Sequence, residues 1–536
     1  MGLDKMDSLI GKLFIIGFNG RFAEEDFLPR YRRIPAAGVI LFGRNLGDPD
    51  QIRSLTATIE AVGEEAHGIP PFIGIDQEGG NLSPLRGFVA SLPGNMGLAA
   101  TGEISAARYA GRKTAEELRE LGFNLVFAPV LDLATNPANP VIGTRAFSDD
   151  PEIVAAFGEA FAHGLMEGGV AFTAKHFPGH GSCREDSHVT LPFSTVARAS
   201  LWEKDLRPFK KVLGLPGASV MTAHVRYAAL DLENPATLSA KIIRDLLRRE
   251  MGFEGVVITD DLEMGAIVER YSVPVAAVMA LKAGADILLF RYNHDYQAQA
   301  IDAILDAVRS GEIPLERIEQ SVERILQVKA IRGIVDRAAA PPQDAAQLTG
   351  RPESIERVRQ ISSRAVTLVR DEGGLVPLPQ GSGLRVLNPA LGEIARAEPL
   401  VRGQATLAAE LRRRGVALDE SAYTLWASDD EIKGHIRAAG TAERLVLATY
   451  DLARYPRQRI LVEQVLALGK PVVAVALRSP YDLMYYRDVP AYLVTYGYRP
   501  ALVAAAADIL AGRARPKGRL PVDLPGLYPA GHGIVR

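Results

Sequence analysis

The chain has 536 residues, 47% of them hydrophobic and 23% charged, which is the composition of a soluble globular protein with two or three domains. Its 61 basic and 64 acidic residues leave a formal net charge of −3, so we expect no nucleic-acid partner. The single cysteine, Cys183, excludes an internal disulfide bond and is typical of a reducing compartment. The first apolar run, Leu13–Gly17, is too short for a signal peptide or a membrane span, and we predict a cytoplasmic protein.

Eight short apolar runs alternate with longer segments of helical periodicity in the first part of the chain. The runs are nearly continuous in Val, Ile, Leu, Phe and Ala, as parallel strands covered on both faces should be. They are Leu13–Phe18, Gly38–Phe42, Phe72–Asp76, Leu125–Val130, Val170–Lys175, Ser219–His224, Val256–Asp260 and Asp286–Phe290. Helical segments include Glu103–Leu121, Pro151–Glu167, Ser239–Met251, Tyr296–Arg309 and Leu315–Ile331. The pattern predicts a (β/α)8 barrel over residues 1–336; an open doubly wound sheet is the alternative, which the even spacing disfavours.

A second alternating region follows a stretch rich in Ala and Pro at residues 337–352, which we interpret as a linker. Its expected strands are Val366–Val369, Arg385–Leu387, Leu445–Tyr450, Val472–Leu477 and Tyr492–Thr495. Its expected helices are Ala405–Arg414, Asp430–Ala438, Arg457–Leu468 and Pro500–Leu510. Residues 353–536 therefore predict a smaller three-layer α/β/α domain with a mainly parallel sheet. No Gly-rich phosphate-binding motif follows a strand, and we predict no cofactor.

Polar residues stand at the carboxyl end of most predicted barrel strands, which is where barrel enzymes carry their chemistry. Six such groups occur at equivalent positions: Arg44-Asn45, Asp76-Gln77-Glu78, Asp132, Lys175-His176, His224 and Asp260-Asp261. Any one Asp among them could be a helix cap, since Asp is common there after a strand. Six groups at six equivalent positions instead predict an active-site rim.

The chemically richest of these ends continues into the loop after Lys175-His176. Pro178, Gly179 and Gly181 exclude a helix, so the loop displays His180, Asp186 and His188 on irregular backbone. Asp186 and His188 lie two residues apart, so the carboxylate can hydrogen-bond the imidazole and fix its tautomer. A zinc site built from these histidines and Asp186 is an alternative, but Lys175 would repel a cation beside them, and we predict no metal.

Residues 175–188, Lys-His-Phe-Pro-Gly-His-Gly followed after four residues by Asp-Ser-His, resemble the signature of the NagZ-type β-N-acetylhexosaminidases of glycoside hydrolase family 3. Segments of similar sequence to this family recur along essentially the whole chain. They are Gly74–Gly80, Ile142–Ser148, Ile258–Met264, Lys517–Val522 and Leu527–Gly533. The resemblance implies a two-domain glycosidase that acts on a small carbohydrate substrate.

The resemblance also implies a role for each matching residue. Asp260 would be the nucleophile, and His188 would be the general acid/base, oriented by Asp186. The residues that would bind the sugar are Asp76, Arg145, Lys175 and His176, with His224 placed beside them. For His224, support of the site through hydrogen bonds and a purely structural role both remain open, as do site-tuning and turn-closing roles for Glu78. Cys183 has no role in the family.

The mechanism implied departs from the usual pair of carboxyl groups in retaining glycosidases. A histidine with a pKa of about 6.5 can both donate and accept a proton near neutral pH, which an ordinary carboxyl group cannot. The expected reaction is therefore exo-acting, retaining hydrolysis of terminal N-acetyl-β-D-hexosaminides, such as those derived from cell walls.

One motif in this chain differs from the family. After Gly79-Gly80 the family usually has Arg-Val-x-Arg-Leu, whereas Pro84 occupies the place of the second Arg, which contacts a sugar hydroxyl. Substrate identity is therefore less constrained than reaction type. Phosphorolysis of a β-glycoside, a broader β-glucosidase activity and sugar binding without turnover remain alternatives. The sequence does not indicate an oligomeric state.

Overall fold

The computed structural model describes residues 3–23, 27–33, 36–85, 87–335, 351–391 and 406–536, in two compact units. The barrel unit comprises Met1–Glu78, Arg108–Ile142 and Pro151–Thr349, and the C-terminal unit comprises Gly79–Ala107, Gly143–Asp150 and Gly350–Arg536. Two segments that precede α6 in sequence thus belong to the C-terminal unit. Residues 337–350 of the expected linker lie outside the described residues.

The barrel unit contains a parallel sheet of eight strands in the order β10-β1-β2-β3-β4-β5-β7-β9, which confirms the predicted barrel. The barrel closes where Ile258 in β9 pairs in parallel with Ile287, just before β10, so the first and last strands of this order meet. Each strand is buried along its whole length, as the apolar runs predicted. The strands are β1 Phe14–Ile16, β2 Gly38–Leu41, β3 Phe72–Ile75, β4 Leu125–Val126, β5 Ala171–Phe177, β7 Ser219–Thr222, β9 Val256–Thr259 and β10 Leu288–Phe290.

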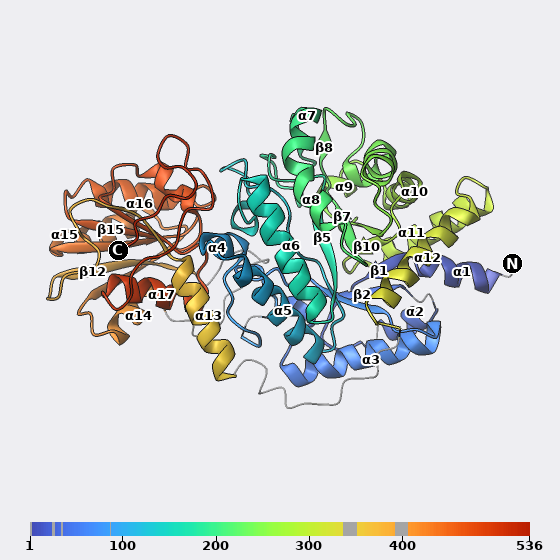
Figure 1. The fold of residues 1–536 in the computed structure, drawn as a ribbon, viewed down its shortest axis with the longest axis horizontal. Helices are drawn as coiled ribbons and strands as arrows, with labels where there is room; N and C mark the ends of the chain where they lie inside the picture. The colour runs from blue at the N-terminus through green and yellow to red at the C-terminus, as the bar shows by residue number, and fades with distance from the viewer. Residues whose placement is uncertain (1–2, 24–26, 34–35, 86, 336–350, 392–405) are drawn as a thin grey trace. The chain divides into compact units, whose positions relative to one another are not determined.

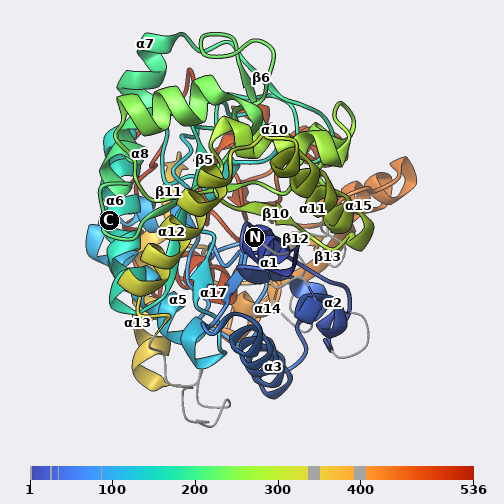
Figure 2. The same ribbon diagram turned by 90° about the vertical axis from the view of Figure 1, so that its right-hand side faces the viewer.

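Helices lie along the outside of these strands (Figures 1 and 2). They are α1 Leu3–Gly11, α2 Leu28–Arg33, α3 Pro49–His67, α5 Ile104–Glu120, α6 Pro151–Glu167, α7 Arg198–Ser200, α8 Leu206–Val212, α9 Gly265–Val268, α10 Val273–Ala283, α11 His294–Arg309 and α12 Leu315–Ile331. The N-terminal helix α1 packs against α11 and α12, and α6 packs against α8. The segment predicted as a helix at Ser239–Met251 is π-helical over Lys241–Glu250 (η5), and Leu201–Asp205 (η3) is a second π-helical segment. A short two-stranded ribbon joins β6 Phe193–Ser194 to β8 Arg226–Tyr227.

The C-terminal unit is built on a six-stranded sheet in the order β11-β16-β15-β14-β12-β13. All neighbours are parallel except β11, which pairs antiparallel with β16, so the predicted mainly parallel sheet is confirmed. Helices α13, α14 and α17 cover one face, and α15 and α16 the other (Figure 1). The strands are β11 Thr367–Asp371, β12 Leu384–Ala390, β13 Asp419–Thr424, β14 Arg444–Thr449, β15 Val472–Ala476 and β16 Ala491–Val494. The helices are α4 Asn95–Ala100, α13 Pro352–Ala365, α14 Leu407–Arg413, α15 Asp429–Thr441, α16 Arg457–Leu466 and α17 Pro500–Leu510.

The sequence did not predict β13, which is the edge strand next to β12. In this strand Tyr423 is the one fully buried side chain, and the others are exposed or half-buried. An edge strand of this kind has no continuous apolar run, so its sequence, Asp-Glu-Ser-Ala-Tyr-Thr, lacks the signal that identified the central strands.

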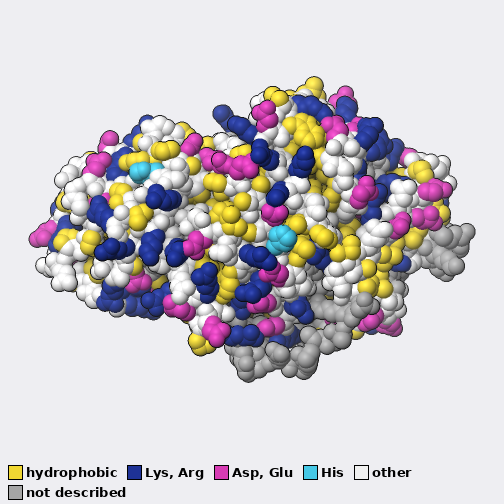
Figure 3. All heavy atoms as spheres, viewed as in Figure 1, with side chains coloured by type: hydrophobic (Ala, Val, Ile, Leu, Met, Phe, Trp, Pro, Cys, Tyr) yellow, Lys and Arg dark blue, Asp and Glu magenta, His cyan; other side chains and the backbone are white. Residues whose placement is uncertain are grey.

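The surface carries charges of both signs. Lys and Arg side chains alternate with Asp and Glu over the face that Figure 3 shows, in keeping with the small net charge. None of the helices in the described ranges combines the length and the apolar character that a membrane-spanning segment needs.

Candidate active site

The barrel unit brings most of the predicted site residues to the carboxyl ends of its strands. Asp76 directly follows β3, and Lys175 and His176 lie near the carboxyl end of the long strand β5. His224 comes two residues after β7, and Asp260 directly follows β9. Because these strands are parallel neighbours in one closed sheet, their carboxyl ends form a single rim. Arg145 belongs to the C-terminal unit.

The Lys175 ammonium group is buried between two carboxylates. Its Nζ lies 2.6 Å from Asp76 Oδ1 and 2.7 Å from Glu78 Oε1. The Glu78 side chain is buried, whereas 27% of the Asp76 side chain is exposed. Lys175 and Glu78 therefore form a fixed ion pair, and the partly exposed Asp76 keeps oxygen surface that can accept hydrogen bonds from a ligand's hydroxyl groups. This geometry supports a role for Glu78 in positioning Lys175.

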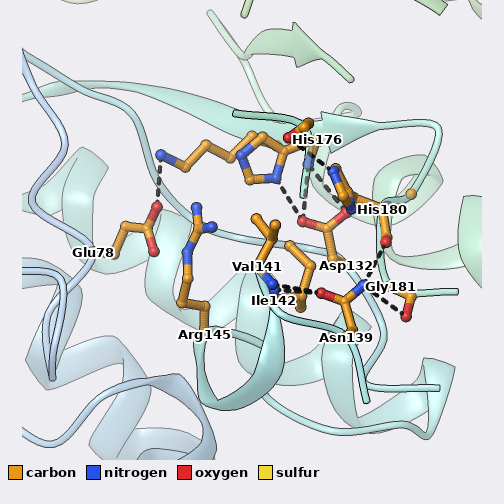
Figure 4. Close-up of polar contacts among 12 residues, drawn as sticks. Glu78, Asp132, Asn139, Val141, Ile142, Arg145, His176, His180 and Gly181 are labelled. Carbon is orange, nitrogen blue, oxygen red and sulfur yellow. Dashed lines mark hydrogen bonds and ion pairs between the residues drawn. The ribbon is translucent and has the colours of Figure 1, made fainter. Parts of the chain in front are cut away.

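His176 is oriented by Asp132, a fully buried carboxylate (Figure 4). Asp132 Oδ2 lies 2.7 Å from His176 Nδ1, and Oδ1 accepts a 2.6 Å hydrogen bond from the His180 backbone N–H. Burial alone would raise the pKa of the Asp132 carboxyl group, but His176 and His180 outweigh it and lower that pKa. The carboxylate therefore stays charged and fixes the His176 ring through its Nδ1 atom. The sequence predicted that Asp132 lies on the active-site rim but did not predict that it orients His176.

Asn139 connects the loop that begins at His180 to the neighbouring turn at Val141–Ile142, a role that no sequence pattern indicated. Its Nδ2 donates to the carbonyl oxygens of His180 and Gly181 at 3.0 and 3.2 Å. Its Oδ1 accepts from the backbone N–H groups of Val141 and Ile142 at 2.9 and 2.7 Å (Figure 4). One buried amide thus satisfies backbone groups of two loops, which holds the start of the His180–His188 loop in place.

The Asp186–His188 pair forms as the sequence predicted. Asp186 Oδ1 lies 2.8 Å from His188 Nδ1 and also accepts a 2.9 Å hydrogen bond from the His188 backbone N–H. The His188 side chain is 56% exposed, so the imidazole is accessible to a substrate. Between them, the buried Ser187 places its Oγ 3.1 Å from His180 Nε2. The loop is therefore anchored through Ser187 and presents the dyad outward.

Asp260 is held as a carboxylate at the end of β9. Burial would raise the pKa of its carboxyl group, but the neighbouring rings of His224, His176 and His188 and the Asp261 N–H outweigh burial, and the pKa is lowered. The Asp261 N–H donates to Asp260 Oδ1 at 2.8 Å. The carboxyl group of Asp260 is therefore favoured in its charged form.

Asp261 and His224 support the turn that carries Asp260. Asp261 is buried, forms an ion pair with Arg291 and accepts a 3.0 Å hydrogen bond from the Glu263 N–H. His224 is fully buried, with Nδ1 2.7 Å from Thr237 Oγ1 and Nε2 2.9 Å from the Asp261 carbonyl oxygen. Burial lowers the pKa of His224. Both ring nitrogens bond protein atoms, so this geometry supports a positioning role for His224 rather than direct contact with a sugar.

Arg145 ends a 3₁₀ turn, Gly143–Arg145, in the C-terminal unit. Its carbonyl oxygen accepts a 2.7 Å hydrogen bond from Asn95 Nδ2, at the start of α4. Pro84, in the place of the family's second Arg, lies in the same unit, and Arg86 lies outside the described residues.

Cys183 is buried, and burial raises the pKa of its thiol to about 12, which favours the thiol over the more reactive thiolate. Among the described residues, no three His, Cys, Asp or Glu side chains are grouped so that they could hold a metal ion.

Asp205 is a buried carboxyl group beside Gly179, in the loop that follows β5, and its environment predicts a pH effect on stability. A Cβ on Gly179, whose φ is +129°, would lie 3.1 Å from Asp205 Oδ1, so the loop packs directly on this group. Burial and then the Asp132 charge raise the pKa of Asp205 from 3.8 to about 7. Between these two values the folded protein binds a proton that the unfolded chain releases, so stability falls as the pH rises from about 4 to 7.

The Asp205→Asn variant should remove this dependence, since an amide does not titrate. Wild type and variant should have similar thermal midpoints near pH 4, and the variant should become the more stable of the two towards pH 7. The difference in free energy of unfolding between the variant and the wild type should change by no more than about 1.4 kcal/mol per pH unit. Thermal unfolding of both proteins from pH 4 to 8 measures it. A difference that stays constant across this range would contradict the assignment.

Comparison with known proteins places the fold and these motifs in a family. The chain matches the glycosyl hydrolase family 3 N-terminal domain over residues 6–328 and the glycosyl hydrolase family 3 C-terminal domain over residues 292–527. It is 30% identical to β-hexosaminidase A of Pseudoalteromonas piscicida, over 92% of this chain and 90% of that protein. It is 40% identical to a β-hexosaminidase of Alkalilimnicola ehrlichii, over 55% of this chain and 84% of that protein.

A solved structure agrees with the sequence matches over both domains. The family 3 β-N-acetylglucosaminidase of Paenibacillus sp. strain FPU-7 is 36% identical and superimposes with a TM-score of 0.93, over 98% of this chain and 99% of the other. The resemblance inferred from the motifs is thereby confirmed along nearly the full length. The chain belongs to glycosyl hydrolase family 3, with both the N-terminal and the C-terminal domain of that family.

Proposed function

We propose that this glycoside hydrolase is a retaining, exo-acting β-N-acetylglucosaminidase that releases terminal N-acetyl-β-D-hexosamine from small carbohydrates. The observation that carries the proposal is the Asp186–His188 dyad, in which Asp186 Oδ1 lies 2.8 Å from His188 Nδ1 on an exposed loop. The same barrel unit also contains the Asp260 carboxylate. The names of the two β-hexosaminidase relatives and of the β-N-acetylglucosaminidase structure support the substrate class.

In the first step Asp260 attacks the anomeric carbon and forms a glycosyl ester, while His188 donates its proton to the departing glycosidic oxygen. In the second step the now neutral His188 removes a proton from water, which attacks the same carbon and releases Asp260. Two displacements at one carbon retain its configuration. Asp186 keeps the proton on Nδ1 and stabilises the imidazolium, so Nε2 performs the transfer.

The charged groups at the other strand ends would bind the sugar. Asp76 can accept hydrogen bonds from hydroxyl groups, and Lys175, held by Glu78, can donate them. His176, oriented by Asp132, and Arg145 complete the proposed sugar-binding set. His224 acts through the Asp260–Asp261 turn.

A panel of 4-nitrophenyl β-glycosides tests the substrate. We expect the N-acetylglucosaminide to have the highest kcat/KM and the unacetylated glucoside to follow, since Pro84 removes one expected sugar contact and weakens discrimination. Equal or faster turnover of the plain glucoside would contradict the ranking and favour a β-glucosidase.

The same panel, run with and without inorganic phosphate, tests the acceptor in the second step. A neutral histidine base repels an incoming phosphate less than a carboxylate does, so phosphorolysis is the alternative to distinguish. Hydrolysis predicts free sugar with retained configuration and no glycosyl phosphate. Accumulation of a sugar 1-phosphate would show that the enzyme is a phosphorylase. If no substrate is turned over, the remaining alternative is a protein that binds sugar without cleaving it. The cell-wall origin of the substrate, the cytoplasmic location and the lack of a nucleic-acid partner stay predictions.

A further inference from the structure

The loop that carries Arg145 is built into the C-terminal unit, although it lies between barrel segments in the sequence. Residues Gly143–Asp150 group with Gly79–Ala107 and Gly350–Arg536. Three residues after Arg145, the fully buried Ser148 donates a hydrogen bond from Oγ to the Pro521 carbonyl oxygen. The next residue, Asp149, accepts a 2.9 Å hydrogen bond at Oδ2 from the Asp523 backbone N–H. Two consecutive side chains thus attach this loop to Pro521–Asp523.

The other side of Arg145 is attached to the same tail through α4. Asn95, a buried residue at the start of α4, donates to the Arg145 carbonyl oxygen at 2.7 Å. At the end of α4, the Ala100 carbonyl oxygen accepts a 3.0 Å hydrogen bond from the Arg519 backbone N–H. Helix α4 also packs against α13. The Arg145 backbone is therefore fixed from both sides by elements that meet at Arg519–Asp523.

This tail segment is itself bound to the C-terminal sheet. The Gly518 N–H donates to the Val366 carbonyl oxygen at 3.2 Å, just before β11. The Leu520 N–H donates to the His532 carbonyl oxygen at 2.8 Å, and His532 Nε2 lies 2.7 Å from the carbonyl oxygen of Val369 in β11. A continuous set of hydrogen bonds thus runs from β11 through the tail to Ser148 and Asp149, three and four residues after Arg145.

We propose that Ser148 and Asp149 are positioning residues, through which the C-terminal tail sets the position of Arg145 for substrate binding. This inference rests on the proposed function, because it needs Arg145 to bind the sugar. Its physical basis is that a displacement of about 1 Å in a positioning group can cost up to about 100-fold in rate.

A double-mutant cycle with Arg145 tests the proposal on the full-length enzyme. The Ser148→Ala and Asp149→Ala variants each release one link to the tail, and Asp149→Asn keeps an oxygen that can still accept from Asp523. We expect kcat/KM for the N-acetylglucosaminide to fall about 10-fold for each alanine variant and less for Asp149→Asn, against a loss of about 100-fold for Arg145→Ala. In the Arg145→Ala background, Ser148→Ala and Asp149→Ala should cause little further loss, since the residue they position is gone.

Glu103→Gln is the matched control. It breaks the Glu103–Arg364 ion pair, which also joins an inserted segment to the rest of the C-terminal unit but does not touch the Arg145 turn. Its kcat/KM should stay at the wild-type value. Thermal midpoints of all variants separate positioning from unfolding, and Asp149→Asn provides the test if an alanine variant does not fold.

Two outcomes overturn the proposal in different ways. If Arg145→Ala lowers kcat/KM but the Ser148 and Asp149 variants do not, or if their losses multiply fully with that of Arg145→Ala, the positioning role is excluded and the proposed function stands. If Arg145→Ala itself leaves kcat/KM unchanged, Arg145 does not bind the sugar, and the inference fails together with that part of the proposed site.

Discussion

The Asp260→Asn variant should lose at least about 10⁴-fold in kcat on every β-glycoside while keeping its fold, because the amide has the shape of the carboxylate but cannot attack the anomeric carbon. The structure supports the choice of Asp260 over its neighbour. Asp260 has a lowered pKa among three histidine rings, whereas Asp261 is committed to Arg291 and to the Glu263 N–H.

Steady-state release of nitrophenol and circular dichroism of the purified variant measure these two properties. The Asp261→Asn variant is the comparison: it weakens the ion pair with Arg291 and should lose stability, with a much smaller loss in kcat. Near-normal activity of Asp260→Asn together with a large loss in Asp261→Asn would move the nucleophile to the neighbouring residue.

The His188→Ala variant should lose activity selectively, according to the leaving group. Nitrophenolate leaves without a proton, so the first step should remain fast with activated aryl glycosides and become slow with alkyl or sugar leaving groups. The second step still needs a base to activate water. The glycosyl-enzyme should therefore accumulate, and a burst of nitrophenol should precede slow turnover.

Asp186→Asn should give a milder form of the same behaviour, because the imidazole remains but loses the carboxylate that bonds its Nδ1 at 2.8 Å. Stopped-flow measurement of nitrophenol release, repeated over a series of leaving groups, detects both the burst and the selectivity. An equal loss on good and poor leaving groups, with no burst, would remove His188 from the mechanism.

The barrel could be predicted because the physical signal is local and repeated. Strands such as Phe72–Ile75 and Val256–Thr259 are covered on both faces, so every residue is apolar or small and the run is visible without any contact information. The same logic failed at β13, whose exposed edge allows polar side chains. The sequence predicted a helix at Ser239–Met251 but not that its hydrogen bonding is π-helical, because amphipathic spacing does not distinguish an α-helix from a π-helix.

The candidate catalytic residues could be identified in the sequence because they are concentrated in two short segments of the chain. Asp186 and His188 are two residues apart, and Asp260 ends a strand whose register fixes its rim position. The contacts of the supporting residues could not be predicted, because the partners are distant in sequence: Asp132 acts on His176 across 44 residues, and His224 bonds the Asp261 carbonyl oxygen across 37. The attachment of Ser148 to Pro521 spans 373 residues and leaves no local pattern.

Mass spectrometry of the intermediate tests the roles of Asp260 and His188 most directly. The His188→Ala variant is mixed with 4-nitrophenyl N-acetyl-β-D-glucosaminide, quenched in acid during the burst and digested with trypsin. We predict one N-acetylhexosaminyl group on the peptide Glu250–Arg270, with fragment ions that place it on Asp260. A sugar attached to Asp76 or another carboxylate, or a product of inverted configuration with no adduct on any peptide, would contradict the mechanism.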